Sequence, residues 1–157
     1  LVDSQGRVVG INTQIFGDKF QGISFAVPSA DARFVFEQII EKGEVRRGYL
    51  GVSLHTGDAR YPNRSVRDSI AKVAVSKMKG ALVVDVPSPS SAAGRAGVRR
   101  FDQIVEWDGH EVEHEQHLFA LIGRTSPDSE IAVKIIRDGR PIELQIQVGD
   151  REQDIRQ

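Results

Sequence analysis

Alternating apolar and polar residues predict strands through most of the first 28 residues of the chain. After a short strand at Leu1-Val2, two longer patterns span residues 7–15 and 22–28, with turn residues between them. Ser29 is then predicted to cap a helix that carries apolar residues at helical spacing and ends near Gly43. These elements offer much apolar surface and little to bury it against, so we expect them to belong to a larger β domain.

The remaining residues predict a second unit of short strands and helices. The dipeptide Asp138-Gly139 predicts a tight hairpin between the last two strands. Residues 44–48 are expected to form a charged linker, and the polar residues 149–157 a frayed tail. Strands are predicted at 49–54, 80–86, 103–107, 130–137 and 141–148, and helices at 64–75, 88–93 and 113–123.

The composition excludes several classes of protein. The chain has 157 residues and a net charge of −1, so it lacks the basic field that favours nucleic acid. No apolar run approaches the ~20 residues of a membrane-spanning helix. The absence of cysteine excludes disulfides and thiolate metal sites. The four histidines stand in no metal-binding motif such as HExxH, so we expect no metal and no cofactor.

Residues 49–148 resemble a PDZ domain of the bacterial type. The family usually has a glycine immediately before the aspartate that corresponds to Asp102, whereas this chain has Phe101. Segment 55–79 is also longer and more charged than is usual in the family. The motifs that carry the resemblance are Gly48-Tyr49-Leu50-Gly51-Val52, residues 80–93, Ala96-Gly97-Val98, residues 102–109 and residues 133–139.

Residues 1–45 resemble the end of the trypsin-like protease domain of the HtrA (Do-like) family. The resemblance rests on Leu1-Val2-Asp3, residues 6–13 and residues 22–29. In that family the corresponding segment follows a Gly-Asn-Ser-Gly-Gly-Pro run with the nucleophilic serine, and the histidine and aspartate of the triad lie further upstream. We therefore expect a C-terminal fragment without catalytic residues that hydrolyses no peptide alone.

The two resemblances together imply a mainly β fold with helices, of the α+β class. Residues 1–45 would be the incomplete C-terminal part of a trypsin-like β-barrel domain. Residues 46–150 would form a PDZ-like, partly open β-barrel or sandwich with two or three helices, and residues 151–157 a polar tail or linker.

PDZ domains bind the free C-terminus of another chain as an added strand. The resemblance implies that the N–H groups of Leu50, Gly51 and Val52 bind the terminal carboxylate, where a side chain at position 51 would intrude. Val52, Ser53 and Leu54 would then pair with the peptide backbone.

The same resemblance implies a pocket for the last side chain of the peptide. Its wall is expected to come from the helix at 113–123, through His117, Leu118 and Leu121. Either Arg46 or Arg47 would add a charge-assisted hydrogen bond to the carboxylate. The alternative interpretation is that the two leucines belong to the core and the arginines to a solvated linker.

In the first unit, Asn12, Thr13 and Gln14 match the strand that pairs with substrate in the protease family. Ser24, where that family commonly has glycine, belongs to the strand that walls the primary specificity pocket. The alternative is that all four residues are ordinary barrel positions without a binding role.

The resemblance implies an HtrA-like serine endopeptidase of protein quality control, whose PDZ-like domain binds C-terminal or exposed hydrophobic peptide segments. Its partners would be peptides or unfolded proteins with free hydrophobic C-termini, not nucleic acid, and the chain has no membrane span. The parent protein would be periplasmic or in the cell envelope, without a cofactor, and a homotrimer or larger. One alternative is the non-catalytic peptide-binding module of an inactive protease paralogue. A PDZ-like domain of a membrane metalloprotease is a third interpretation, against which residues 1–45 argue.

Overall fold

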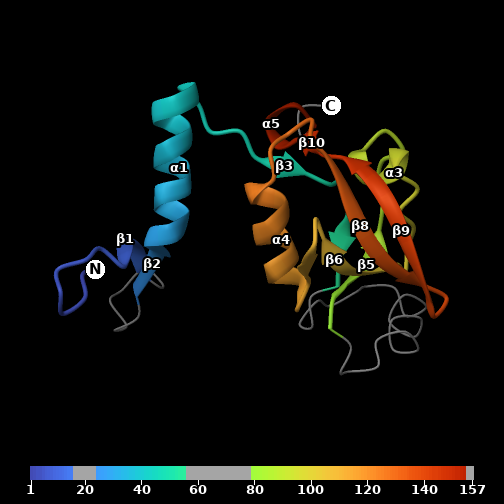
Figure 1. The fold of residues 1–157 in the computed structure, drawn as a ribbon, viewed down its shortest axis with the longest axis horizontal. Coiled ribbons are helices and arrows are strands. Elements are labelled where there is room, and N and C mark those ends of the chain that lie inside the picture. Colours follow the sequence, from blue (N-terminus) through green and yellow to red (C-terminus); the bar gives the residue numbers. More distant parts are fainter. Residues whose placement is uncertain (16–23, 56–78, 155–157) are drawn as a thin grey trace. The chain divides into compact units, whose positions relative to one another are not determined.

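The computed structural model describes residues 1–15, 24–55 and 79–154, so the helix predicted at 64–75 lies outside the described residues. The chain divides into two compact units, Leu1–Val45 and Arg46–Gln157 (Figure 1). Within the described ranges, no helix has the length and apolar character needed to cross a bilayer.

The first unit consists of a two-stranded sheet and a helix. Strand β1 (Gly10–Ile15) pairs antiparallel with β2 (Ser24–Pro28), which leads directly into α1 (Ser29–Lys42). Gly43 ends the helix as predicted, with a positive φ of 76°. The predicted cap is wrong, because Pro28 occupies the N-cap position and no side chain bonds to the first turn.

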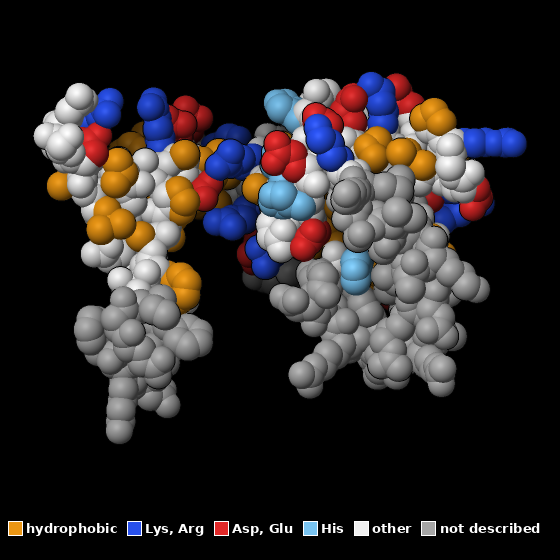
Figure 2. Space-filling view, turned by 90° about the horizontal axis from the view of Figure 1, so that it is seen from below, with side chains coloured by type: hydrophobic (Ala, Val, Ile, Leu, Met, Phe, Trp, Pro, Cys, Tyr) orange, Lys and Arg blue, Asp and Glu red, His pale blue; other side chains and the backbone are white. Residues whose placement is uncertain are grey.

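Hydrophobic side chains of this first unit lie on its surface (Figure 2). Helix α1 has no buried residue, and Ile40 is 70% exposed. Every hydrophobic residue of the described core belongs to the second unit, so the described part of the first unit builds no core of its own. Its exposed large hydrophobic residues are Leu1, Val2, Val8, Val9, Ile11, Phe25, Val27, Phe36, Ile39 and Ile40.

The second unit is built on an antiparallel sheet of six strands. Their order is β4-β5-β6-β8-β9, and β7 pairs with β6 away from this path, so β4 lies at one edge. The strands are β4 (Ser53–Leu54), β5 (Ala81–Asp85), β6 (Gln103–Trp107), β7 (His110–Glu111), β8 (Glu130–Arg137) and β9 (Arg140–Gln147). This arrangement of mainly strands with a few helices confirms the expected α+β class, and the sheet does not close into a barrel.

A second, two-stranded sheet joins the two ends of this unit. Strand β3 (Gly48–Tyr49) pairs antiparallel with β10 (Gly149–Asp150), and α5 (Arg151–Asp154) follows directly. The prediction of a frayed tail at 149–157 is therefore wrong for its first residues. A strand of two residues has too little alternation to be detected in a polar sequence.

The hairpin predicted at Asp138-Gly139 is confirmed. Both residues have positive φ, 51° and 74°, as a type I′ turn requires, and β8 and β9 pair on either side of them. The single strand predicted at 49–54 is wrong, because residues 50–52 leave the strand conformation between β3 and β4, and Gly51 has a φ of 77°.

One hydrophobic core holds the sheet and the helices of this unit together. It contains residues of α3 (Ala92–Arg95) and of α4 (Glu115–Arg124), which packs against β3, β5 and β6. Trp107 is buried at its centre, and its indole N–H donates to Thr125 Oγ1 over 2.9 Å. Each fully buried aliphatic side chain of such a core contributes about 1.5–3 kcal/mol to folding.

A buried carboxylate fixes the loop that enters β6. Asp102 is fully buried and accepts hydrogen bonds from Arg137 Nε and Nη2, each over 2.7 Å, and from the Arg99 N–H over 2.7 Å. The hydrogen bonds that Arg137 donates to Asp102 raise the pKa of its guanidinium above its ordinary value. Phe101 precedes this anchor with a φ of 72°, the conformation for which the PDZ family usually has glycine.

Candidate functional site

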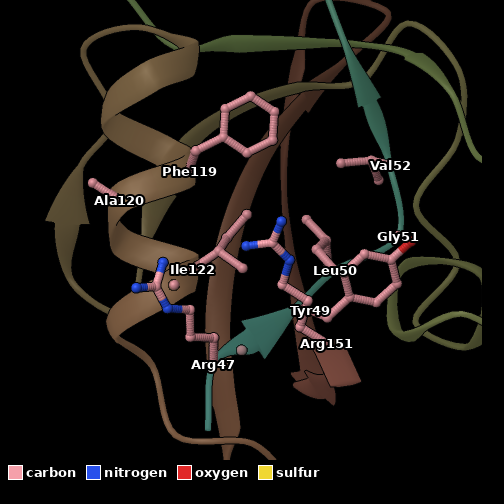
Figure 3. A pocket seen from close by; sticks show the side chains of 11 residues that line it. Arg47, Tyr49, Leu50, Gly51, Val52, Phe119, Ala120, Ile122 and Arg151 are labelled. Carbon is pink, nitrogen blue, oxygen red and sulfur yellow. The ribbon is translucent and has the colours of Figure 1, made fainter. Parts of the chain in front are cut away.

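A cavity of about 530 Å³ opens between the segment that joins β3 to β4 and helix α4 (Figure 3). Its walls are mainly apolar, and its charged side chains are arginines. The residues that line it are Arg47, Gly48, Tyr49, Leu50, Gly51, Val52, Phe119, Ala120, Ile122, Gly123 and Arg151.

Among the described residues, Leu50 and Gly51 accept hydrogen bonds through their carbonyl groups, and the N–H groups of Leu50, Gly51 and Val52 donate none. Leu50 O accepts a hydrogen bond from Ala93 N–H over 2.8 Å, and Ser91 Oγ lies 3.5 Å from Gly51 O. No acceptor in the described parts of the chain takes a hydrogen bond from the three N–H groups. Unbonded amides beside a cavity are the groups that a carboxylate ligand satisfies.

The two glycines around Tyr49-Leu50 are required by the protein's own packing. A Cβ at Gly51 would lie 2.5 Å from Ser91 Cβ, in addition to the strain of a positive φ. A Cβ at Gly48 would lie 2.3 Å from Ile122 O, at the end of α4. Glycine 51 was expected to leave room for a bound carboxylate, and the structure corrects this reason, because the nearest obstruction is the loop before α3.

The residues expected to pair with a peptide lie at the free edge of the main sheet. Ser53 and Leu54 form β4, which pairs with β5 on one side. Val52 lines the cavity immediately before this strand. On its other side β4 has no strand partner among the described residues, so its polar backbone groups are available to an added strand.

Helix α4 presents a different face to the cavity from the one predicted. Leu118 is fully buried in the core, while His117 and Leu121 line a separate hollow beside Trp107. The structure therefore does not place these three residues in the wall of this cavity. With about 100° between successive residues, Phe119 turns toward the cavity beside the face that buries Leu118, and the core residue Ile122 also lines it.

Two histidines fix the beginning of α4. His114 is the N-cap, and its Nδ1 accepts a hydrogen bond from His117 N–H over 3.1 Å. His117 Nδ1 in turn accepts one from Glu113 N–H over 3.4 Å. This reciprocal pattern resembles a capping box, with imidazoles in place of hydroxyl and carboxylate. Among the described residues, no group of three or more potential ligands is placed to hold a metal ion.

The two arginines before β3 have separate positions. Arg46 donates to Asp150 Oδ2 from Nε over 2.9 Å and from Nη2 over 2.6 Å. These hydrogen bonds raise the pKa of the Arg46 guanidinium above its ordinary value. Arg47 lines the cavity instead.

The candidate residues of the first unit lie on its small sheet. Asn12, Thr13 and Gln14 belong to β1 and are exposed, and Ser24 begins β2 opposite Ile15. The register shifts between Asn12 and Gln14, and Thr13 Oγ1 donates to Phe25 O over 3.2 Å. Their assignment to a substrate-binding strand and a specificity pocket stays a prediction.

Residues 48–148 match the family model described as PDZ domain. The chain belongs to the PDZ family. Its PDZ domain and the residues before it are 36% identical over 152 residues to a probable periplasmic serine endoprotease DegP-like of Halomonas elongata, which covers 96% of this chain and 30% of the relative. A protein of the same description from Chlamydia pneumoniae is 35% identical over 150 residues, 94% of this chain and 29% of the relative. The predicted resemblance to HtrA-type proteases is therefore confirmed, and the chain spans less than a third of the length of these relatives.

Solved structures show the same similarity. An HtrA-type protease AlgW with tripeptide superposes with a TM-score of 0.74 at 32% identity, over 96% of this chain and 48% of that chain. The serine endoprotease from Yersinia pestis superposes with a TM-score of 0.62 at 28% identity, over 95% of this chain and 45% of that chain.

Sequence reasoning missed part of the cavity of the PDZ domain. Leu118, Phe119, Leu121 and Ile122 are all apolar, and spacing alone does not tell which of them face the core and which line a cavity. Arg151 stands in a polar stretch without periodicity, so nothing in the pattern indicated that it lines the cavity.

Proposed function

We propose that the PDZ domain binds the free carboxyl terminus of another polypeptide between β4 and α4. The single observation that carries this proposal is the set of unbonded amides at Leu50, Gly51 and Val52 beside the apolar cavity. The terminal carboxylate accepts hydrogen bonds from these amides, and the peptide backbone extends the sheet along Val52, Ser53 and Leu54. Two of the similar HtrA-type protease structures are described as carrying a decapeptide and a tripeptide, which supports the same use here.

The last side chain of the peptide enters the cavity between the loop and α4. Leu50 and Val52 supply one apolar wall, and Phe119 and Ile122 supply the other. Phe119 is 51% exposed, the one large hydrophobic residue of the described PDZ domain that is so open to solvent. A peptide that covers it removes apolar surface from water on both partners.

The expected affinity is modest. Hydrogen bonds to a carboxylate contribute about 1.5–3 kcal/mol each, and one buried aliphatic side chain adds about 1.5–3 kcal/mol. Association itself costs at least about 4 kcal/mol. The difference corresponds to a dissociation constant of roughly micromolar size.

Fluorescence anisotropy with one labelled peptide in two forms tests the proposal. The free acid should bind at least about tenfold more tightly than the C-terminal amide, because amidation removes the charge that the backbone N–H groups bind. Phe119→Ala should weaken binding of the acid, whereas Gln116→Ala, on an exposed part of α4 outside the cavity, should not. Equal affinity for acid and amide would refute carboxylate recognition.

At the level of the whole protein, we propose that the chain is part of a periplasmic HtrA-like serine endopeptidase of protein quality control, assembled as a homotrimer or larger. The names of the DegP-like relatives support the assignment to a periplasmic serine endoprotease. The motif Gly-Asn-Ser-Gly-Gly-Pro is absent from the 157 residues, so this chain by itself should not cleave casein. Turnover that a serine-directed inhibitor abolishes would contradict this expectation. An inactive paralogue is the alternative, and the coding sequence upstream of Leu1 distinguishes the two.

A further inference from the structure

The segment that follows residue 148, where the match to the PDZ family ends, contributes to the cavity proposed to bind the peptide. Strand β10 lies beyond residue 148, where the match ends, and pairs with β3 through Gly149 opposite Tyr49 and Asp150 opposite Gly48. Arg151 N–H then donates to Arg47 O over 3.0 Å. The backbones of the two cavity arginines are therefore held in register by main-chain hydrogen bonds.

Asp150 determines which arginines remain available to a ligand. Its side chain is 6% exposed and is engaged by Arg46, while its Oδ1 accepts a hydrogen bond from Glu152 N–H over 3.0 Å. Arg47 and Arg151 line the cavity, and neither side chain forms an ion pair with a carboxylate in the described parts of the chain. Figure 3 shows Arg151 pointing into the cavity, with its guanidinium drawn between Ile122 and Leu50.

The cavity therefore carries two positive charges and no negative one among its 11 lining residues. Two guanidinium groups at one site repel each other, and each offers a planar set of donors that matches a carboxylate. The terminal carboxylate of a peptide supplies one negative charge, held by the amides of the loop. Charge complementarity then leaves a place for a second anionic group, and Arg151 points into the cavity, with its guanidinium between Ile122 and Leu50.

We propose that Arg151 is a specificity-determining residue that binds an acidic side chain within the last two residues of the peptide. This inference rests on the proposed function, because it places the second anion beside a terminal carboxylate that the loop amides already hold. The methylene groups of such a side chain lie against Leu50 and Ile122, and its carboxylate binds the guanidinium. The preferred ligand is thus a doubly anionic chain end with an apolar body.

Two matched peptide pairs and two matched variants test the inference on the whole 157-residue chain. The labelled peptides share one body and end in Glu-Leu, Gln-Leu, Ala-Glu or Ala-Gln, so that each pair differs by one charge. The variants are Arg151→Gln and Arg140→Gln, the latter at an exposed arginine of β9 outside the cavity. In the native chain at least one acidic peptide should bind about threefold to tenfold more tightly than its amide-side-chain partner, and added salt should reduce the difference.

Arg151→Gln should abolish that preference while leaving the discrimination between free acid and C-terminal amide in place. Arg140→Gln should leave both unchanged, and circular dichroism with thermal unfolding should show that both variants fold. The inference is overturned if neither pair shows a preference in the native chain, or if the preference survives in Arg151→Gln. Loss of acid-against-amide discrimination in the native chain would instead refute the proposed function itself, so the two failures are distinct.

Discussion

Arg46 and Asp150 lie 104 positions apart in the chain and meet in an ion pair, with Asp150 Oδ2 2.9 Å from Arg46 Nε and 2.6 Å from Nη2. The pair joins Arg46, two residues before β3, to the last residue of β10, so it holds together the two strands that Arg47 and Arg151 flank. The carboxylate is the buried member, at 6% exposure, and Arg46 is half-buried at 36%.

Replacing Asp150 with alanine should loosen both ends of the PDZ domain. The change removes the hydrogen bonds to Arg46 and to Glu152 N–H, so we expect the midpoint of thermal unfolding to fall by at least about 4 °C. The matched control is Asp128→Asn, because Asp128 contacts the same guanidinium at 3.4 Å but is 72% exposed, and asparagine tolerates its positive φ of 67°. Its midpoint should change little, and equal effects of the two variants would contradict the structural role of Asp150.

The variants Gly51→Ala and Gly97→Ala distinguish the cost of a steric clash from the cost of a positive φ. Both glycines have a φ of 77°, but only at Gly51 would the new Cβ meet another atom, Ser91 Cβ at 2.5 Å. Gly97→Ala should cost about 1 kcal/mol of unfolding free energy from φ alone. Gly51→Ala should cost about 1–3 kcal/mol more, because the loop must move away from Ser91. Urea denaturation measures both, and similar values would show that the loop adapts.

A larger residue at Gly51 is therefore not a test of binding alone. The structure indicates that stability falls together with affinity, since the obstruction lies on the protein side of the loop. Val52 and Phe119 are better positions for variants that test binding, because both line the cavity.

Phe101 has a positive φ of 72°, which a side chain makes unfavourable. Phe101→Gly and Phe101→Ala both remove the ring and its contact with the Arg100 guanidinium, which lies 4.9 Å from the ring centroid. Only glycine also relieves the backbone, so Phe101→Gly should be about 1 kcal/mol more stable than Phe101→Ala. Chemical denaturation of the pair gives the difference, and an alanine variant as stable as the glycine variant would count against backbone strain.

His114 is expected to stabilise α4 through its cap. His114→Ala leaves the His117 N–H without its acceptor and should cost about 0.5–2 kcal/mol of unfolding free energy. His114→Ser should restore most of the loss, because serine is a favourable N-cap residue. Hydrogen exchange of the amides in the first turn of α4 reports the same change locally. Unchanged exchange in the alanine variant would show that the cap contributes nothing.

Many elements of both units could be predicted from the sequence because their signals are local. The Asp138-Gly139 turn, the strands around it and the glycine that ends α1 each depend on neighbouring residues. The break between β3 and β4 could not be located in the same way. The break depends on the close approach of Gly51 to Ser91, which lies 40 positions away in the chain. No pattern within residues 48–54 indicates that contact.

A sequence motif predicted the loop residues Leu50 to Val52 of the cavity. The face of α4 that lines the cavity could be identified only from the fold. Leu118 and Ile122 both enter the core, and the competition between them and their neighbours determines the rotation of α4. The contribution of Arg151 depends on the pairing of β10 with β3, which joins two short polar segments from opposite ends of the domain.

The pairing of β3 with β10 also has a consequence for engineering. Because Gly48 and Asp150 are opposite each other, a short glycine-rich connection between the two ends should close the domain into a ring. New termini could then be opened at the exposed Asp138-Gly139 turn, to give a circular permutant with the same sheet. Such a permutant would join β10 to β3 by a continuous chain at the peptide cavity, with β9 as its first strand and β8 as its last.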